Sequence, residues 1–112
     1  MELIKRDDII LDVYTSTKIY GTQFEEQNDK QFKPMYDKME SLKNVNHIGY
    51  KTNLEVIDAM QDTQIFAYPS IWEETFCISA MEAMAAGNMA IVTNFGALFE
   101  TCTEYAHYVN YE

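Results

Sequence analysis

The chain has 112 residues, 47% of them hydrophobic and 13% aromatic, which favours one small globular domain and excludes a disordered chain. Its 18 acidic residues outnumber the 8 basic ones, and the resulting net charge of −10 disfavours nucleic acid as a partner. No apolar run approaches the roughly 20 residues that a membrane-spanning helix needs, so we expect no integral membrane segment.

The first third of the chain predicts a strand, a loop and a helix. Residues Ile9–Tyr14 are apolar and β-branched, which predicts a buried strand. The polar stretch Ser16–Asn28 predicts a long loop. A helix is expected after it, with Pro34 in the first turn, because apolar residues then recur at helical spacing: Phe32, Met35, Tyr36, Met39 and Leu42.

The middle of the chain predicts two further strands with a helix between them. Val45–Ile48 is short and apolar and ends at Gly49, which indicates a strand. Thr52 and Glu55 form a capping-box pattern that opens a helix extending to about Gln61. Gln64–Tyr68 predicts the next strand, which stops before a proline.

The last third predicts an apolar helix, a strand and a short helix. We expect the apolar helix over Cys77–Ala86, with Gly87 as its C-cap. Met89–Thr93 predicts a strand and Ala97–Tyr105 a short helix. The end, Tyr108–Tyr111, is interpreted as a frayed edge.

Alternating strands and helices predict an α/β fold with a parallel sheet and helices on its faces. Ligands of such sheets bind at the carboxyl ends of the strands. This rule places four segments on one rim: Ser16–Gly21, Gly49–Thr52, Ser70–Cys77 and Asn94–Ala97.

Two carboxylates mark the apolar helix as a candidate binding site. Glu82 is the single charge within it, and a buried charge needs a partner. Glu74 precedes the helix, with seven residues between it and Glu82. Carboxylates in this arrangement can hold two ends of a polyhydroxylated ligand.

The stretch Glu74-Thr-Phe-Cys-Ile-Ser-Ala-Met-Glu82, followed by Ala-Met-Ala-Ala-Gly, resembles a known motif. It is similar to the Glu-x7-Glu motif of retaining GT-B glycosyltransferases, especially family 4 (glycosyl transferases group 1). The resemblance extends from about Asn44 to about Glu100. It implies a Rossmann-like parallel sheet with flanking helices, as the incomplete C-terminal half of a GT-B fold.

The resemblance implies different roles for the two carboxylates. Glu74 would be the catalytic residue that contacts the donor sugar's hydroxyls and stabilises positive charge near the anomeric carbon. Glu82 would bind the ribose hydroxyls of the nucleotide, because a carboxylate accepts two hydrogen bonds from a diol. The alternatives are a solvated Glu74 favoured by the helix dipole, and a Glu82 in an exposed stripe with Ser79 and Ala86.

The residues after Glu74 replace a Gly-Phe-Gly sequence whose backbone amides face the donor in that family. Phe76 keeps the aromatic position, whereas Thr75 and Cys77 replace both glycines. Whether the backbone still reaches a conformation with positive φ is therefore open. A packing role is the alternative for Cys77, because no His or basic residue nearby activates its thiol.

Two other rim segments carry candidate donor-binding residues by the same resemblance. Asn94 and Gly96 form a turn near the phosphates or sugar, or an ordinary strand-to-helix turn. Gly49 and Tyr50 occupy the position that holds the nucleobase in the family, and Tyr50 is either a stacking partner or a plain surface residue.

No metal or cofactor is expected, and a nucleotide-sugar would be the substrate. The two cysteines have no zinc-binding spacing with each other or with the histidines, and retaining transfer in the family uses no metal. Two lone cysteines are typical of reduced thiols, and Met1–Asp8 lacks the apolar segment of a signal peptide. We therefore expect a cytoplasmic protein.

The resemblance further implies that residues 1–112 are a single partial domain, without the first strand and the closing helices of the donor-binding domain. The family's basic residues that hold the donor diphosphate have no counterpart here, so the isolated chain is expected to be inactive or nearly so. A missing N-terminal domain or a second copy is an expected partner, and the acceptor is left open. The alternative function is a non-catalytic nucleotide-sugar-binding or self-associating module of the same fold.

Overall fold

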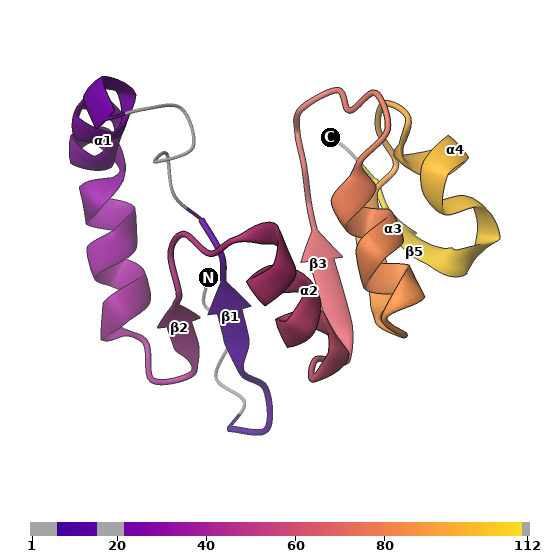
Figure 1. Cartoon of the computed structure of the whole chain (residues 1–112), viewed down its shortest axis with the longest axis horizontal. Helices are drawn as coiled ribbons and strands as arrows, with labels where there is room; N and C mark the ends of the chain where they lie inside the picture. The colour runs from indigo at the N-terminus through magenta and orange to yellow at the C-terminus, as the bar shows by residue number, and fades with distance from the viewer. Residues whose placement is uncertain (1–6, 16–21, 111–112) are drawn as a thin grey trace. The chain divides into compact units, whose positions relative to one another are not determined.

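The computed structural model describes residues 7–15 and 22–110 of the chain. They belong to two compact units, Met1–Thr52 and Asn53–Glu112 (Figure 1). The predicted rim segment Ser16–Gly21 lies outside the described residues, as do residues 111–112. Every strand pair in both units is parallel, which confirms the predicted α/β class, although the strands form two sheets and not one.

The first unit contains a two-stranded sheet and one long helix. Strand β1 (Leu11–Val13) pairs with β2 (Val45–His47), and the register places Leu11 opposite Val45. Helix α1 (Thr22–Ser41) connects the two strands and packs on β2. Among the described residues of this unit, Met39 of the helix and Val45 of the strand are the buried apolar side chains.

Helix α1 starts much earlier than the sequence pattern indicates. The predicted loop Ser16–Asn28 is wrong from Thr22 onward, and Pro34 lies inside the helix instead of in its first turn. The added turns carry Glu, Gln and Lys, which are good helix formers but show no apolar face. The pattern of apolar residues therefore does not predict the N-terminal end of α1, because that end has little apolar surface to bury.

The second unit is a three-stranded sheet in the order β3-β4-β5. Its strands are β3 (Ile65–Tyr68), β4 (Met89–Thr93) and β5 (Ala106–Val109). The helices are α2 (Asn53–Gln61), α3 (Ile78–Ala85) and α4 (Leu98–Cys102), followed by a 3-10 turn, η2 (Thr103–Tyr105). Helix α3 packs on β3, β4 and α4.

The C-terminal end is more regular than predicted. Tyr108 belongs to β5, a strand whose register pairs it with Val92, and so the expected frayed edge is wrong for Tyr108 and Val109. The expected helix Ala97–Tyr105 is divided, because Thr103 takes a positive φ of 47° after α4 and a 3-10 turn follows. Because Thr103 leaves the helical region of φ and ψ, the α-helix ends there.

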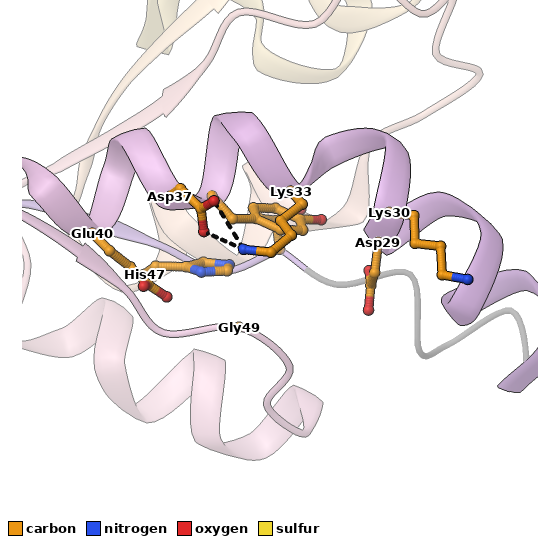
Figure 2. Close-up of a pocket in the computed structure, with 9 residues that line it drawn as sticks. Asp29, Lys30, Lys33, Asp37, Glu40, His47 and Gly49 are labelled. Carbon is orange, nitrogen blue, oxygen red and sulfur yellow. Dashed lines mark hydrogen bonds and ion pairs between the residues drawn. The ribbon is translucent and has the colours of Figure 1, made fainter.

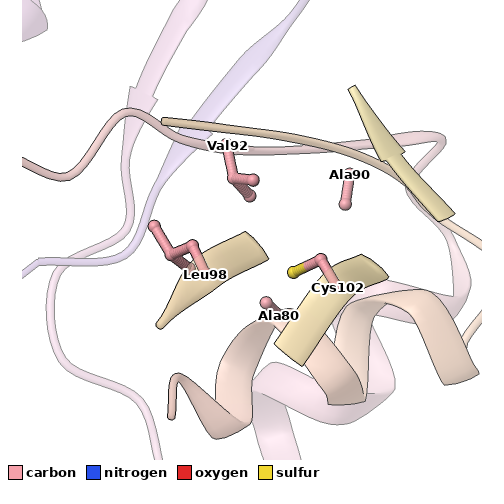
Figure 3. Close-up of a cluster of buried hydrophobic side chains, with 5 residues drawn as sticks. All are labelled: Ala80, Ala90, Val92, Leu98 and Cys102. Atoms are coloured by element: carbon pink, nitrogen blue, oxygen red, sulfur yellow. The ribbon is translucent and has the colours of Figure 1, made fainter. Parts of the chain in front are cut away.

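Five fully buried side chains form the core of the second unit (Figure 3). They come from α3, β4 and α4: Ala80, Ala90, Val92, Leu98 and Cys102. The two alanines have small side chains, so α3 approaches β4 closely. Burying a side chain such as Leu98 contributes about 1.5–3 kcal/mol to stability, so this cluster holds α3 and α4 on the sheet.

A buried amide joins the end of α2 to the start of β4. Asn88 is 6% exposed, donates a hydrogen bond to the Met60 carbonyl at 2.6 Å and accepts one from the Thr63 hydroxyl at 2.7 Å. Because a buried polar group without partners is costly, these bonds fix the connection between the two elements.

Candidate functional site

Two of the predicted rim segments meet at the carboxyl ends of β3 and β4. The segment after β3 contacts the turn after β4 through two hydrogen bonds. The Ala97 N–H donates to the Glu74 carbonyl at 2.9 Å, and the Thr93 hydroxyl donates to the Ser70 carbonyl at 2.6 Å. The neighbouring strands therefore place Ser70–Cys77 and Asn94–Ala97 side by side, as the sheet rule predicts.

Glu74 is half-buried, and its carboxylate has a fixed partner. Its Oε1 accepts a hydrogen bond from the Tyr68 hydroxyl at 2.5 Å. Burial of the Tyr68 ring, together with the hydrogen bond and the charge of Glu74, raises the pKa of Tyr68 to about 12. The Tyr68 hydroxyl is therefore protonated and a donor at neutral pH, and Glu74 is not the freely solvated carboxylate of the alternative interpretation.

Gly96 makes room for the backbone of Glu74. Its φ is +60°, and a Cβ added there would lie 2.8 Å from the Glu74 nitrogen and 2.9 Å from the Glu74 carbonyl oxygen. No side chain fits at that distance, so a glycine is needed for the two segments to meet. Gly96 thus has an intramolecular role, and its contact with a donor stays a prediction.

Cys77 adopts the left-handed conformation that the replaced family glycine would allow. Its φ is 65° and its ψ is 75°, and it is the N-cap residue of α3. Burial raises the pKa of the Cys77 thiol, with a further contribution from the charge of Glu74. The side chain packs against the core cluster, so the thiol is a packing group and not an activated nucleophile.

The two residues between Glu74 and Cys77 are exposed. Phe76 is 49% exposed, and its carbonyl accepts a hydrogen bond from the Thr101 hydroxyl at 2.5 Å. Thr75 is exposed beside it. Their backbone is thus tied to α4, while both side chains are open to solvent.

Glu82 lies in α3 and is half-buried. Its Oε1 accepts a hydrogen bond of 3.4 Å from Nδ2 of Asn53, the first residue of α2. Because the Glu82 side chain is partly accessible to water, its charge costs less than the full burial suggested by the apolar sequence of the helix. The sequence pattern did not single out Asn53, because a polar residue at a helix start is also typical of capping.

The first unit holds a separate hollow of about 410 Å³ (Figure 2). The hollow is lined by Thr15, Asp29, Lys30, Lys33, Tyr36, Asp37, Glu40, His47 and Gly49. The Lys33 ammonium lies 2.9 Å from both carboxylate oxygens of Asp37, and the rings of Tyr36 and His47 stack with centroids 4.6 Å apart. The α1 residues of this hollow were missed because their polar side chains show no motif.

The hollow is poorly suited to a diphosphate. Its three carboxylates outnumber its two ammonium groups, and Lys33 is already paired with Asp37. Gly49 follows β2 with a φ of +78°, and Tyr50 beside it is 44% exposed. Their contact with a nucleobase stays a prediction.

The predicted site residues divide between the two units. Gly49 and Tyr50 lie in the first unit, and all the others lie in the second. Within the second unit the structure brings Glu74 and Gly96 together, whereas Asn94 is exposed at the end of β4, where its backbone N–H donates to the Val109 carbonyl at 2.9 Å.

Residues 7–15 and 22–110 contain neither a candidate metal-binding cluster nor a helix that could span a membrane. No group of three or more His, Cys, Asp or Glu side chains in these ranges is arranged to hold a metal ion. None of the helices in these ranges has the length and apolarity needed to cross a membrane.

Comparison with known proteins gives one finding. The family model for glycosyl transferases group 1 matches residues 2–109 of the chain. No curated protein and no solved structure gave a significant match.

Proposed function

The chain belongs to the glycosyl transferases group 1 family, and from this premise we propose that it is the donor-binding part of a glycosyltransferase. We propose further that the enzyme is a retaining, family 4-like member with a GT-B fold and that its donor is a nucleotide-sugar. The Glu-x7-Glu motif with a fixed Glu74 carboxylate supports this proposal most strongly.

Glu74 is the proposed catalytic residue. A carboxylate at the strand ends can accept hydrogen bonds from the sugar's hydroxyls and stabilise positive charge that develops near the anomeric carbon. Such stabilisation requires a group that is already oriented before the reaction. The Tyr68 hydroxyl and the contacts of the Glu74 backbone with Gly96 and Ala97 supply that orientation.

Glu82 is the proposed partner of the ribose. Its position in α3, half-exposed and with a long hydrogen bond of 3.4 Å from Asn53, leaves its carboxylate accessible to a vicinal diol. The backbone N–H groups at the start of α3 are the proposed contacts of the phosphates, and the left-handed Cys77 sets the direction of the backbone there.

Isothermal titration of the full chain with UDP-, GDP- and ADP-sugars tests the donor-binding proposal. We expect one of these donors to bind, and Glu82→Ala to weaken binding about 10-fold, since a hydrogen bond to a charged group contributes about 1.5–3 kcal/mol. Ser79→Ala is the matched control, because Ser79 is an exposed residue of the same helix. Binding of none of the donors, or equal binding by Glu82→Ala, would contradict the proposal.

A further inference from the structure

Packing fixes the ring of Tyr68. The residue ends β3, and its side chain is half-buried against the core cluster of the second unit. The ring also lies nearly parallel to that of Phe66, with centroids 5.8 Å apart and an interplanar angle of 10°. A tyrosine has few rotatable bonds, so these contacts also set the position of its hydroxyl.

The Tyr68 hydroxyl holds one oxygen of Glu74. The hydrogen bond to Oε1 is short and joins a neutral donor to a charged acceptor, which makes it stronger than a bond between neutral groups. Among the described residues, no hydrogen bond reaches Oε2 of Glu74. Tyr68 therefore occupies one carboxylate oxygen, while Oε2 has no hydrogen bond from residues 7–15 or 22–110.

The backbone of Glu74 is held independently of its side chain. The Ala97 N–H binds its carbonyl, and the close approach of Gly96 leaves the segment little room to move. With both the backbone and Oε1 fixed, the side chain has little freedom left, so the direction of Oε2 is set as well.

From this geometry we propose that Tyr68 is a positioning residue for Glu74, which directs the second carboxylate oxygen at a single hydroxyl of the donor's sugar. This inference rests on the proposed donor-binding function. It assigns Tyr68 to recognition of the sugar and not of the nucleotide. Loss of the hydroxyl should therefore affect an intact nucleotide-sugar and leave the free nucleoside diphosphate unaffected.

The Tyr68→Phe variant tests whether affinity for the nucleotide-sugar falls while affinity for the nucleoside diphosphate does not. It keeps the ring and its packing and removes only the hydroxyl. We expect titration calorimetry to show about 5- to 10-fold weaker binding of the nucleotide-sugar, the usual size of one lost hydrogen bond, with unchanged affinity for the matching nucleoside diphosphate. Combining Tyr68→Phe with Glu74→Gln should weaken binding no further than Glu74→Gln alone, because the two residues act through one contact.

Tyr108→Phe is the matched control. Tyr108 also lies in a parallel strand of the second unit, and its hydroxyl donates to the Thr103 carbonyl. Removing that hydroxyl breaks a hydrogen bond without touching Glu74. Its nucleotide-sugar affinity should therefore equal that of the unmodified chain.

A second measurement does not depend on any ligand. Burial of the ring is the main reason that the pKa of Tyr68 is raised to about 12, and the hydrogen bond and charge of Glu74 raise it further, so that pKa should fall part of the way in Glu74→Gln while the effect of burial remains. Carbon NMR of the tyrosine ring during a pH titration follows it directly. Cys77 also raises this pKa and Ser70 lowers it, and both are unchanged in the variant.

The outcomes separate this inference from the proposed function. A chain that binds no nucleotide-sugar overturns the proposed function and the sugar contact with it. If the chain binds its donor but Tyr68→Phe binds equally well, only the positioning role fails. An equal loss for nucleotide-sugar and nucleotide would show a merely structural role for Tyr68. A Tyr68 pKa unchanged in Glu74→Gln would refute the contact itself.

Discussion

Cys77 combines an unfavourable backbone conformation with a favourable side-chain position. The left-handed region costs a non-glycine residue about 1–2 kcal/mol, and here φ is 65°. The thiol packs against the core cluster, which offsets part of that cost. The chain thus retains at this position the backbone direction that a glycine would give, at the expense of local strain.

Comparing Cys77→Gly with Cys77→Ala measures that strain. Both variants lose the packed thiol, but only glycine tolerates the left-handed backbone without cost. We expect Cys77→Gly to unfold with a free energy about 1 kcal/mol higher than that of Cys77→Ala in urea titrations followed by circular dichroism. An alanine variant as stable as the glycine variant would show that the backbone at this position is unstrained.

At the scale of elements, Gly96 couples two loops of the candidate site. We expect Gly96→Ala to be destabilising by about 2 kcal/mol or more, because the added methyl group would overlap the Glu74 backbone in addition to straining its own. Gly87→Ala is the control: Gly87 also has a positive φ, of +91°, but nothing lies within 4 Å of the added Cβ. Thermal unfolding of both variants separates the overlap from the backbone cost. Equal losses of stability in Gly96→Ala and Gly87→Ala would mean that the two loops move apart at little cost to accommodate the added methyl group.

The sequence predicts the elements that carry a long, regular apolar pattern and misses those that do not. Helix α3 and strand β4 are apolar along most of their length, and the structure places them within a residue or two of the predicted bounds. The N-terminal half of α1 is polar, and its sequence pattern predicts a loop. Strand β5 is missed because its four residues, Ala106–Val109, include a histidine and are too few for a clear strand pattern.

The candidate site could be predicted only as positions along the chain. The Glu-x7-Glu spacing identifies Glu74 and Glu82, and the sheet rule places Glu74 near Gly96. The partners that fix each carboxylate, Tyr68 and Asn53, have no motif. They follow from how the side chains pack, which a single sequence does not encode in any local pattern.

At the scale of the whole molecule, β3 is an edge strand of the three-stranded sheet. It pairs with β4 on one side, and no described strand of the second unit covers the other. Its four residues, Ile65–Tyr68, carry no charge, and Ile65 is 50% exposed. Uncharged, apolar edges favour association with another strand.

We therefore expect the chain to self-associate as its concentration rises, and light scattering after size-exclusion chromatography to show it. Ile65→Lys should shift the chain toward the monomer, because a charge at a strand edge opposes pairing. Ile71→Lys is the control: Ile71 is 75% exposed but lies outside any strand. A chain that stays monomeric at all concentrations would show that the β3 edge is not open to pairing with another strand.

The Cys102 side chain lies at the centre of the core, so the rate at which its thiol is labelled depends on how often the core opens. The thiol is fully buried, and burial raises its pKa, so a thiol reagent in solution has no access to it while the core is closed. Each reaction at Cys102 must therefore wait for the contacts between α3, β4 and α4 to open. Where opening and closing are fast compared with the labelling reaction, the labelling rate reports the free energy of separating these elements without denaturant.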